Sequence, residues 1–149
     1  TERDLDEIFP VIALLEGRAA HGATCRAGDA DVAALQVLHQ RLQQCAAEGR
    51  ITDYYAAKHA IHEAFITLAD NRWLAQAIGD LRKILRLARL QQLHAPGRLQ
   101  QSLAEHLAVF DALKRRDSEA AEAAMRTHLL HQREALRDVA RNQQSRLNP

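Results

Sequence analysis

Three histidines, His62, His106 and His128, lie on the apolar stripes of three different predicted helices. Each recurs with apolar residues at steps of three and four, which is the spacing of a single helix face. We therefore expect all three imidazoles to point into the interior of a helical bundle. Burying an imidazole without a partner costs desolvation free energy, and one metal ion would satisfy three together. The apolar residues that share these stripes are Tyr55, Phe65 and Ala69, then Leu99, Leu103, Phe110 and Leu113, then Ala121, Met125, Ala135 and Val139.

Metal binding is the chemistry that clustered imidazoles favour. Imidazole nitrogens suit Zn, Ni, Cu, Fe and Co, whereas Ca selects oxygen ligands. Three protein ligands leave coordination positions open for water or for the carboxylate of a bound molecule. A carboxylate-bridged di-iron site is excluded, because it needs a glutamate three residues before a histidine. Those positions hold His59, Leu103 and Met125.

The three histidines are also compatible with roles that need no metal. A single histidine on an apolar helix face is usually a hydrogen-bonded packing residue. The three could also pair with a buried acid or line a water-filled cavity. The other five histidines carry less information: we expect His21, His39 and His94 to face solvent or lie in loops, whereas His59 and His131 lie one turn from His62 and His128.

The composition indicates one all-α domain. The chain has 149 residues, which is the length of one domain, and only 4% of them are aromatic. The net charge of +1 does not resemble the basic footprint of a nucleic-acid-binding domain. No apolar run reaches the roughly 18 residues of a membrane span, and no phosphate loop, nucleophile elbow or Cys-x-x-Cys occurs. Cys25 and Cys45 are interpreted as reduced, small apolar residues of a cytoplasmic protein.

The helical periodicity predicts an antiparallel bundle of about six helices joined by short loops. Asp29 or Asp31 is expected to cap the second helix, and Thr52 the third. Asp70-Asn71 and Ala95-Pro96-Gly97 are expected breaks. The polar tail from 143 to 149 is expected to fray. The helices are predicted at about 2–26, 32–47, 52–68, 72–93, 98–115 and 118–142.

The order and spacing of the three histidines resemble the FCD domain, the C-terminal effector-binding domain of the FadR branch of GntR-type transcription regulators. The interval from His62 to His106 is twice that from His106 to His128. Nearly the whole of residues 1–149 shares the resemblance. Similar segments are DLDEIF at 4–9 and LEGRAA at 15–20, IH at 61–62 and ADNRWL at 69–74, EH at 105–106, FDAL at 110–113, and AAEAAMRTHL at 120–129.

The resemblance implies a metal site. In the family, three histidines and an Asp or Asn one turn before the first bind a divalent metal, which often helps to hold a small carboxylate effector. It therefore implies that His62, His106 and His128 bind a divalent transition metal, Zn or Ni. Lys58 stands at the fourth position. Because an ammonium and a metal cation repel each other, Lys58 must swing away, be neutral, or leave the metal weak or absent. Ile12 replaces an arginine that many relatives carry.

The resemblance also implies an anionic ligand. We expect a small carboxylate effector, with positive charge supplied by the metal or by Lys58. Arg86 and Arg89 are further candidate carboxylate partners; the alternative for both is a solvated helix face. Family members carry an N-terminal winged helix-turn-helix domain that binds operator DNA as a dimer, and no basic recognition helix occurs in these residues. The implied protein is the sensor part of a cytoplasmic homodimeric regulator, neither an enzyme nor a membrane protein.

Two further functions fit the same residues. One is a three-histidine metalloenzyme, although no motif places a general base beside the histidines. The other is a metal-free helical domain with a structural or dimerisation role, in which the histidines are packing residues.

Overall fold

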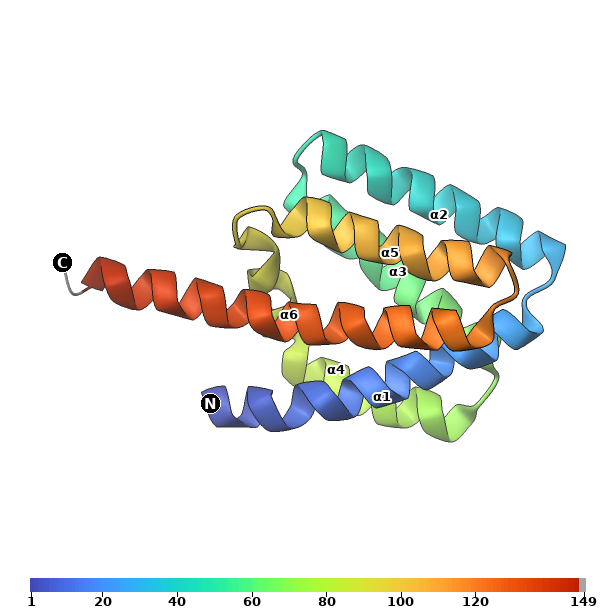
Figure 1. Cartoon of the computed structure of the whole chain (residues 1–149), viewed down its shortest axis with the longest axis horizontal. Helices are drawn as coiled ribbons and strands as arrows, with labels where there is room; N and C mark the ends of the chain where they lie inside the picture. Colours follow the sequence, from blue (N-terminus) through green and yellow to red (C-terminus); the bar gives the residue numbers. More distant parts are fainter. Residues whose placement is uncertain (148–149) are drawn as a thin grey trace.

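The computed structural model describes residues 1–147, an all-α bundle without a strand in that range (Figure 1). This confirms the fold class expected from the sequence. None of the helices in this range is long and apolar enough to cross a membrane. The elements are α1 (Glu2–Arg26), α2 (Asp29–Ala47), α3 (Ile51–Ala69), α4 (Arg72–Gln91), the short 3-10 helix η1 (Gln92–His94), α5 (Arg98–Lys114) and α6 (Ser118–Leu147).

The expected breaks fall where the helices end. Asp70 ends α3 in the left-handed conformation with φ of 50°, and the side chain of Asn71 accepts a hydrogen bond from Leu74 N at the start of α4. Gly97 has φ of 72°, which a residue with a side chain adopts only at a cost, and α5 begins directly after it. Short-range sequence signals therefore locate both of these turns correctly.

Several helix boundaries differ from the sequence expectation, among them the end of α4, which is at Gln91 instead of residue 93. The Asp31 carboxylate accepts a hydrogen bond from Gly28 N, so Gly28 is the N-cap and α2 begins at Asp29. Thr52 lies inside the first turn of α3, whose N-cap is Arg50. α6 continues to Leu147 instead of ending near residue 142, because no glycine or proline interrupts that stretch. Residues 143–147, expected to fray, are helical, and residues 148 and 149 lie outside the described range.

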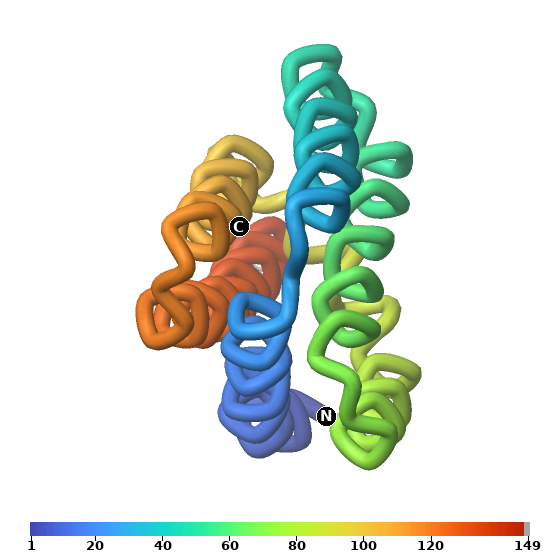
Figure 2. Tube along the Cα trace, turned by 90° about the vertical axis from the view of Figure 1, so that its right-hand side faces the viewer, coloured from blue at the N-terminus to red at the C-terminus, as the bar shows by residue number. Residues whose placement is uncertain are grey.

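Helices distant in the sequence pack against one another. α1 lies alongside α6, and α5 also packs on α6, while α2 and α3 form a neighbouring pair (Figures 1 and 2). The close approach of α1 to α6 depends on Gly17, where an added Cβ would lie 2.5 Å from Arg126 Cγ. The first and last helices thus form one wall of the bundle.

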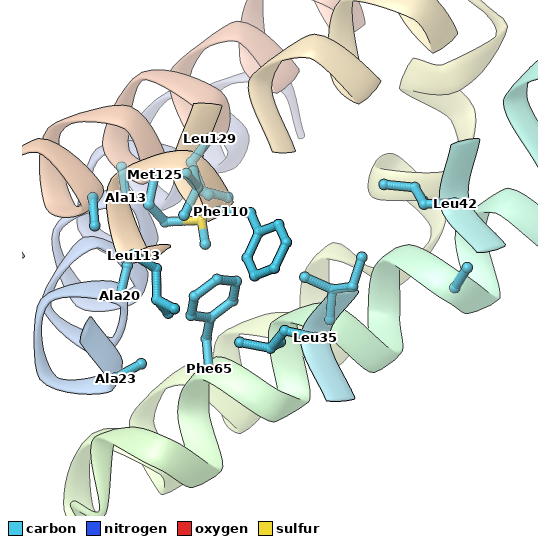
Figure 3. Close-up of a cluster of buried hydrophobic side chains, with 14 of the residues drawn as sticks. Ala13, Ala20, Ala23, Leu35, Leu42, Phe65, Phe110, Leu113, Met125 and Leu129 are labelled. Carbon is cyan, nitrogen blue, oxygen red and sulfur yellow. The ribbon is translucent and has the colours of Figure 1, made fainter. Parts of the chain in front are cut away.

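The main apolar core fills the space between these helices (Figure 3). Phe65 of α3 and Phe110 of α5 lie at its centre, with Leu35 of α2 and Leu113, Met125 and Leu129 around them. A smaller cluster of Ala19, Ile66, Ala69 and Ile78 joins α1, α3 and α4. Because the core fixes α3, α5 and α6 relative to one another, it also fixes the polar side chains one to two turns away on the same helices.

Candidate functional site

The three predicted histidines meet inside the bundle. His62 projects from α3, His106 from α5 and His128 from α6, and each is almost completely buried. One nitrogen of each ring can be chosen so that all three lie within 4.8 Å of one another. The ring centroids are 5.0 Å apart for His62 and His106, 5.5 Å for His62 and His128, and 4.4 Å for His106 and His128. The three side chains could therefore hold one metal ion.

Two carboxylates stand behind the histidine rings. His128 Nδ1 donates to Glu105 Oε1 over 2.7 Å, and His62 Nδ1 lies 3.4 Å from Glu16 Oε1. A proton held on Nδ1 leaves the Nε2 lone pair free. Within residues 1–147, the Nε2 atoms of His62 and His106 have no hydrogen-bond partner. A carboxylate behind a histidine and a free nitrogen in front of it is the usual arrangement of metal-binding histidines.

The side-chain amide of Gln132 is hydrogen-bonded to the Nε2 atom of the third histidine, His128. Its Nε2 lies 3.0 Å from His128 Nε2, one turn away on α6, and its Oε1 is buried with no partner within the described chain. The amide therefore donates to the same lone pair that a metal would take. A small rotation of this side chain would free His128 for coordination.

Burial keeps the three imidazoles neutral. Loss of solvent lowers the pKa of His62, His106 and His128 well below the ordinary value of 6.5, and neighbouring positive groups lower it further. The neutral ring is the form that binds metal. The site is therefore ready for a cation at neutral pH.

Lys58 lies inside the bundle one turn before His62. Its side chain is 1% exposed, and Nζ has no hydrogen-bond partner among the described residues. Burial, followed by the charges of Arg89 and Arg98, lowers the pKa of Lys58 well below 10.5. Of the three outcomes expected from the sequence, the side chain does not swing out to solvent, and the neutral amine agrees with its surroundings. A neutral amine does not repel a divalent cation as an ammonium would.

Glu16 of α1 is a buried acid that was not singled out from the sequence. Its Oε1 lies 3.5 Å from Arg89 Nη1 and 3.6 Å from Arg82 Nε, in addition to its contact with His62. Both arginines come from α4 and are buried. A signal was present in the sequence, since Glu16 lies one turn after Ile12 and one turn before Ala20, in the middle of an apolar stripe.

A second buried charge network surrounds Glu105. The guanidinium of Arg98, 1% exposed, donates to Glu105 and to the side-chain oxygen of Gln92. His131, which is partly exposed, donates through Nδ1 to Oε2 of Glu105, whereas His128 donates to Oε1. Glu105 therefore links buried His128 to a histidine at the surface, and neither Arg98 nor Glu105 was singled out from the sequence.

The two arginines expected to be carboxylate partners differ in burial. Arg89 is 2% exposed and contacts Glu16, so the solvated-face alternative is wrong for it. Arg86 is exposed, in agreement with that alternative, and lines a cleft between α3 and α4.

The burial of His39 and of the two cysteines agrees only in part with the sequence expectation. His39 was expected to face solvent but is buried: its Nδ1 contacts Leu35 O at 2.7 Å and its ring stacks on Phe110 at 4.3 Å. His39 lies one turn after Leu35 and one turn before Leu42, on the buried face of α2, which the sequence expectation overlooked. Cys45 is a buried free thiol as expected, whereas Cys25 is free but exposed.

Comparison with known proteins identifies a family. The family model of the FCD domain matches residues 7–131. The uncharacterized HTH-type transcriptional regulator YdhC of Bacillus subtilis (strain 168) is 23% identical over 140 residues, which are 93% of this chain and 62% of that protein. The solved structure of E. coli McbR/YncC has the same fold, with a TM-score of 0.82 and 23% identity over 91% of this chain and 65% of that one. The chain thus spans less than two thirds of either protein.

Proposed function

Because the chain belongs to the FCD domain family, we propose that it is the effector-binding domain of a GntR-type transcription regulator and not an enzyme. The similarity to YdhC, described as an HTH-type transcriptional regulator, supports this role. Operator DNA would be bound by a winged helix-turn-helix domain outside residues 1–149. The regulator would act as a cytoplasmic homodimer.

The buried site would hold a divalent transition metal, zinc or nickel. His62, His106 and His128 would be its ligands, and the observation that carries this proposal is the pair of unpartnered, buried Nε2 atoms on His62 and His106 within residues 1–147. Glu16 and Glu105 would orient two of the rings from behind through Nδ1. The metal would supply positive charge to a carboxylate that takes its open position.

The effector would be a small carboxylate. The amine of Lys58 is buried without a partner in the described chain, so it can donate a hydrogen bond to such a group. Arg89 Nη2 also has no hydrogen-bond partner there and can donate another. Because these groups come from α3 and α4 and the histidines add α5 and α6, a bound effector would favour one arrangement of four helices. That preference is what a DNA-binding domain could sense.

Metal content and thermal stability test the central claim. The tag-free chain is analysed for zinc and nickel by mass spectrometry, and its thermal midpoint is measured in EDTA and with added zinc. A metal that binds the folded state at a hundred times its Kd adds about 2.7 kcal/mol, which is roughly 5–10 °C for a domain of this size.

Two variants make that experiment specific. His106→Ala should abolish the zinc-dependent rise, because it removes one of three ligands. His94→Ala is the matched control, since His94 is exposed in η1, and it should keep the full rise. An equal rise in His106→Ala, or no rise in the unaltered chain, would contradict the metal site.

A further inference from the structure

Helix α4 carries an apolar stripe on the side that faces away from the bundle. Trp73, Ile84 and Leu87 are each 65–66% exposed. They belong to a set of positions that recur at steps of four, three, four, three and four, which is the spacing of a helix face that packs against another helix. We call this set the α4 seam; its members are Trp73, Ala77, Asp80, Ile84, Leu87 and Gln91.

Nothing within residues 1–147 covers the α4 seam. α4 lies at the edge of the bundle, with α1 and α3 beside it (Figure 2). Leu15 of α1 and Leu74 of α4 pack on the same small cluster, so Val11, one turn before Leu15 and 48% exposed, extends the apolar surface onto α1. Four of the eight large apolar side chains exposed in this range therefore lie on one α1–α4 face. Such a concentration marks an interaction surface.

The α4 seam is complementary to a second copy of itself. Two α4 helices can pack antiparallel about a two-fold axis at the level of Arg82. Ala77 then lies opposite Leu87 of the second copy, so a small side chain meets a large one, and Asp80 lies next to Lys83 of the second copy. The axis makes each contact twice. Within one copy Asp80 and Lys83 are exposed and 3.7 Å apart, so both can pair across the axis.

We propose that the α4 seam, with Val11 of α1 beside it, is the surface through which two copies of this chain form a two-fold dimer. The inference rests on the proposed function, which includes a homodimer without assigning its surface. The sensor domain would dimerise by itself, without a DNA-binding domain. The inner side of α4 carries Arg82 and Arg89, which contact Glu16, so the helix that joins the two copies also lies beside the histidine centre.

Analytical ultracentrifugation measures the association directly. At micromolar concentration the unaltered chain should sediment with twice its mass of 16.7 kDa. Ile84→Glu should weaken the dimer at least tenfold, because it places a carboxylate beside Asp80 of the second copy. Its thermal midpoint should match that of the unaltered chain diluted to a monomer, since Ile84 is exposed.

Val37→Glu is the matched control. It makes a similar apolar-to-acidic change at a side chain that is 64% exposed, on α2, which lies at the top of Figure 2 while α4 lies at the lower right. Its dimer Kd should stay within twofold of that of the unaltered chain.

Exchanging the two charges tests the antiparallel pairing. Asp80→Lys alone and Lys83→Asp alone each place like charges next to each other across the axis, and each should weaken the dimer at least fivefold. The double variant restores opposite charges, so its dimer Kd should return to within threefold of the unaltered value.

Three results would overturn the proposal. A chain that stays monomeric at its highest soluble concentration would leave the seam to another partner. A dimer unaffected by Ile84→Glu, or weakened equally by Val37→Glu, would place the contact elsewhere. Single charge changes without effect, or a double change that does not recover their loss, would exclude the antiparallel pairing.

These outcomes are separate from those of the metal test. A monomeric chain that still gains thermal stability from zinc would overturn the dimer surface alone. A dimer that gains none would contradict the metal site and leave the dimer surface in place.

Discussion

At the scale of single residues, the centre of this domain is a set of polar groups that are buried, although each of them is better solvated in water. Three imidazoles, the Lys58 amine and the Glu16 carboxylate are all buried. Burial favours the neutral forms of Lys58 and the histidines by lowering the pKa of each. Two guanidinium groups lie beside the Glu16 carboxylate. The interior thus combines neutral metal-binding nitrogens with permanently charged arginines.

Acid should destabilise the metal-free domain through these histidines. Because burial lowers the pKa of His62, His106 and His128 well below 6.5, only the unfolded chain takes up their protons as the pH falls below 6.5. Their contribution is fully present above pH 6.5 and is lost below it. Each histidine contributes about 1.4 kcal/mol per pH unit, so these three add about 4 kcal/mol per unit to the slope. Burial also lowers the pKa of His39 and of Lys58, so these two groups steepen the slope further.

Urea unfolding in EDTA at intervals between pH 8 and pH 5 measures that slope. His106→Gln should reduce the slope by about 1.4 kcal/mol per pH unit, because one titrating group is removed. His94→Ala, at an exposed histidine, should leave it unchanged. A free energy of unfolding that stays constant between pH 6.5 and pH 5 would show that the three rings are not buried as neutral groups.

At the scale of elements, the helices and the three histidines could be predicted because both follow a local repeat. Positions three and four apart share a face, so periodicity alone turns His62, His106 and His128 inward. The same repeat indicates that Glu16 is buried, but it does not indicate which charged groups pair with it. Glu16 and Arg89 are 73 residues apart, and their pairing depends on how α1 and α4 pack, which no local pattern encodes. His39 shares a helix face with Leu35 and Leu42, so the repeat was sufficient to predict its burial, whereas its stacking on Phe110 of α5 depends on how the helices pack.

Two glycines on different helices test how tightly the elements pack. Gly79→Ala should raise the free energy of unfolding by about 0.5–1 kcal/mol, because the helix gains a better former and the new Cβ meets nothing within 4 Å. Gly17→Ala should instead lower it, since its Cβ would lie 2.5 Å from Arg126 Cγ, where α1 meets α6.

Removing the Arg126 side chain separates the two effects at Gly17. In an Arg126→Ala background the obstructing atoms are gone, so Gly17→Ala should recover most of the helical gain, leaving only the 3.3 Å approach to Glu122 O. Urea unfolding of the unaltered chain, the two single variants and the double variant gives the result. A stabilising Gly17→Ala in the unaltered chain would mean that α1 and α6 pack less closely than in this structure.

At the scale of the whole molecule, one carboxylate connects the histidine centre to two buried arginines of α4. Glu16 contacts His62 on one side and both Arg82 and Arg89 on the other. The proposed carboxylate effector, held by Lys58 and Arg89, would compete with Glu16 for these guanidinium groups and offset their positive charge. Glu16, now 3.4 Å from His62 Nδ1, would then be free to accept a hydrogen bond from it, which raises the basicity of Nε2. Both effects favour a cation at the histidines.

A carboxylate effector should therefore tighten zinc binding, and zinc should tighten the effector by the same factor. Benzoate serves as the carboxylate probe. Competition with a chromophoric chelator gives the zinc Kd with and without saturating benzoate, and we expect a decrease of fivefold or more. The factor should fall in Glu16→Gln, and benzamide should have no effect. A factor of one in the unaltered chain would contradict a carboxylate site beside the metal. The factor itself is the quantity compared, because a charge change near the site shifts the zinc Kd of each variant even without benzoate.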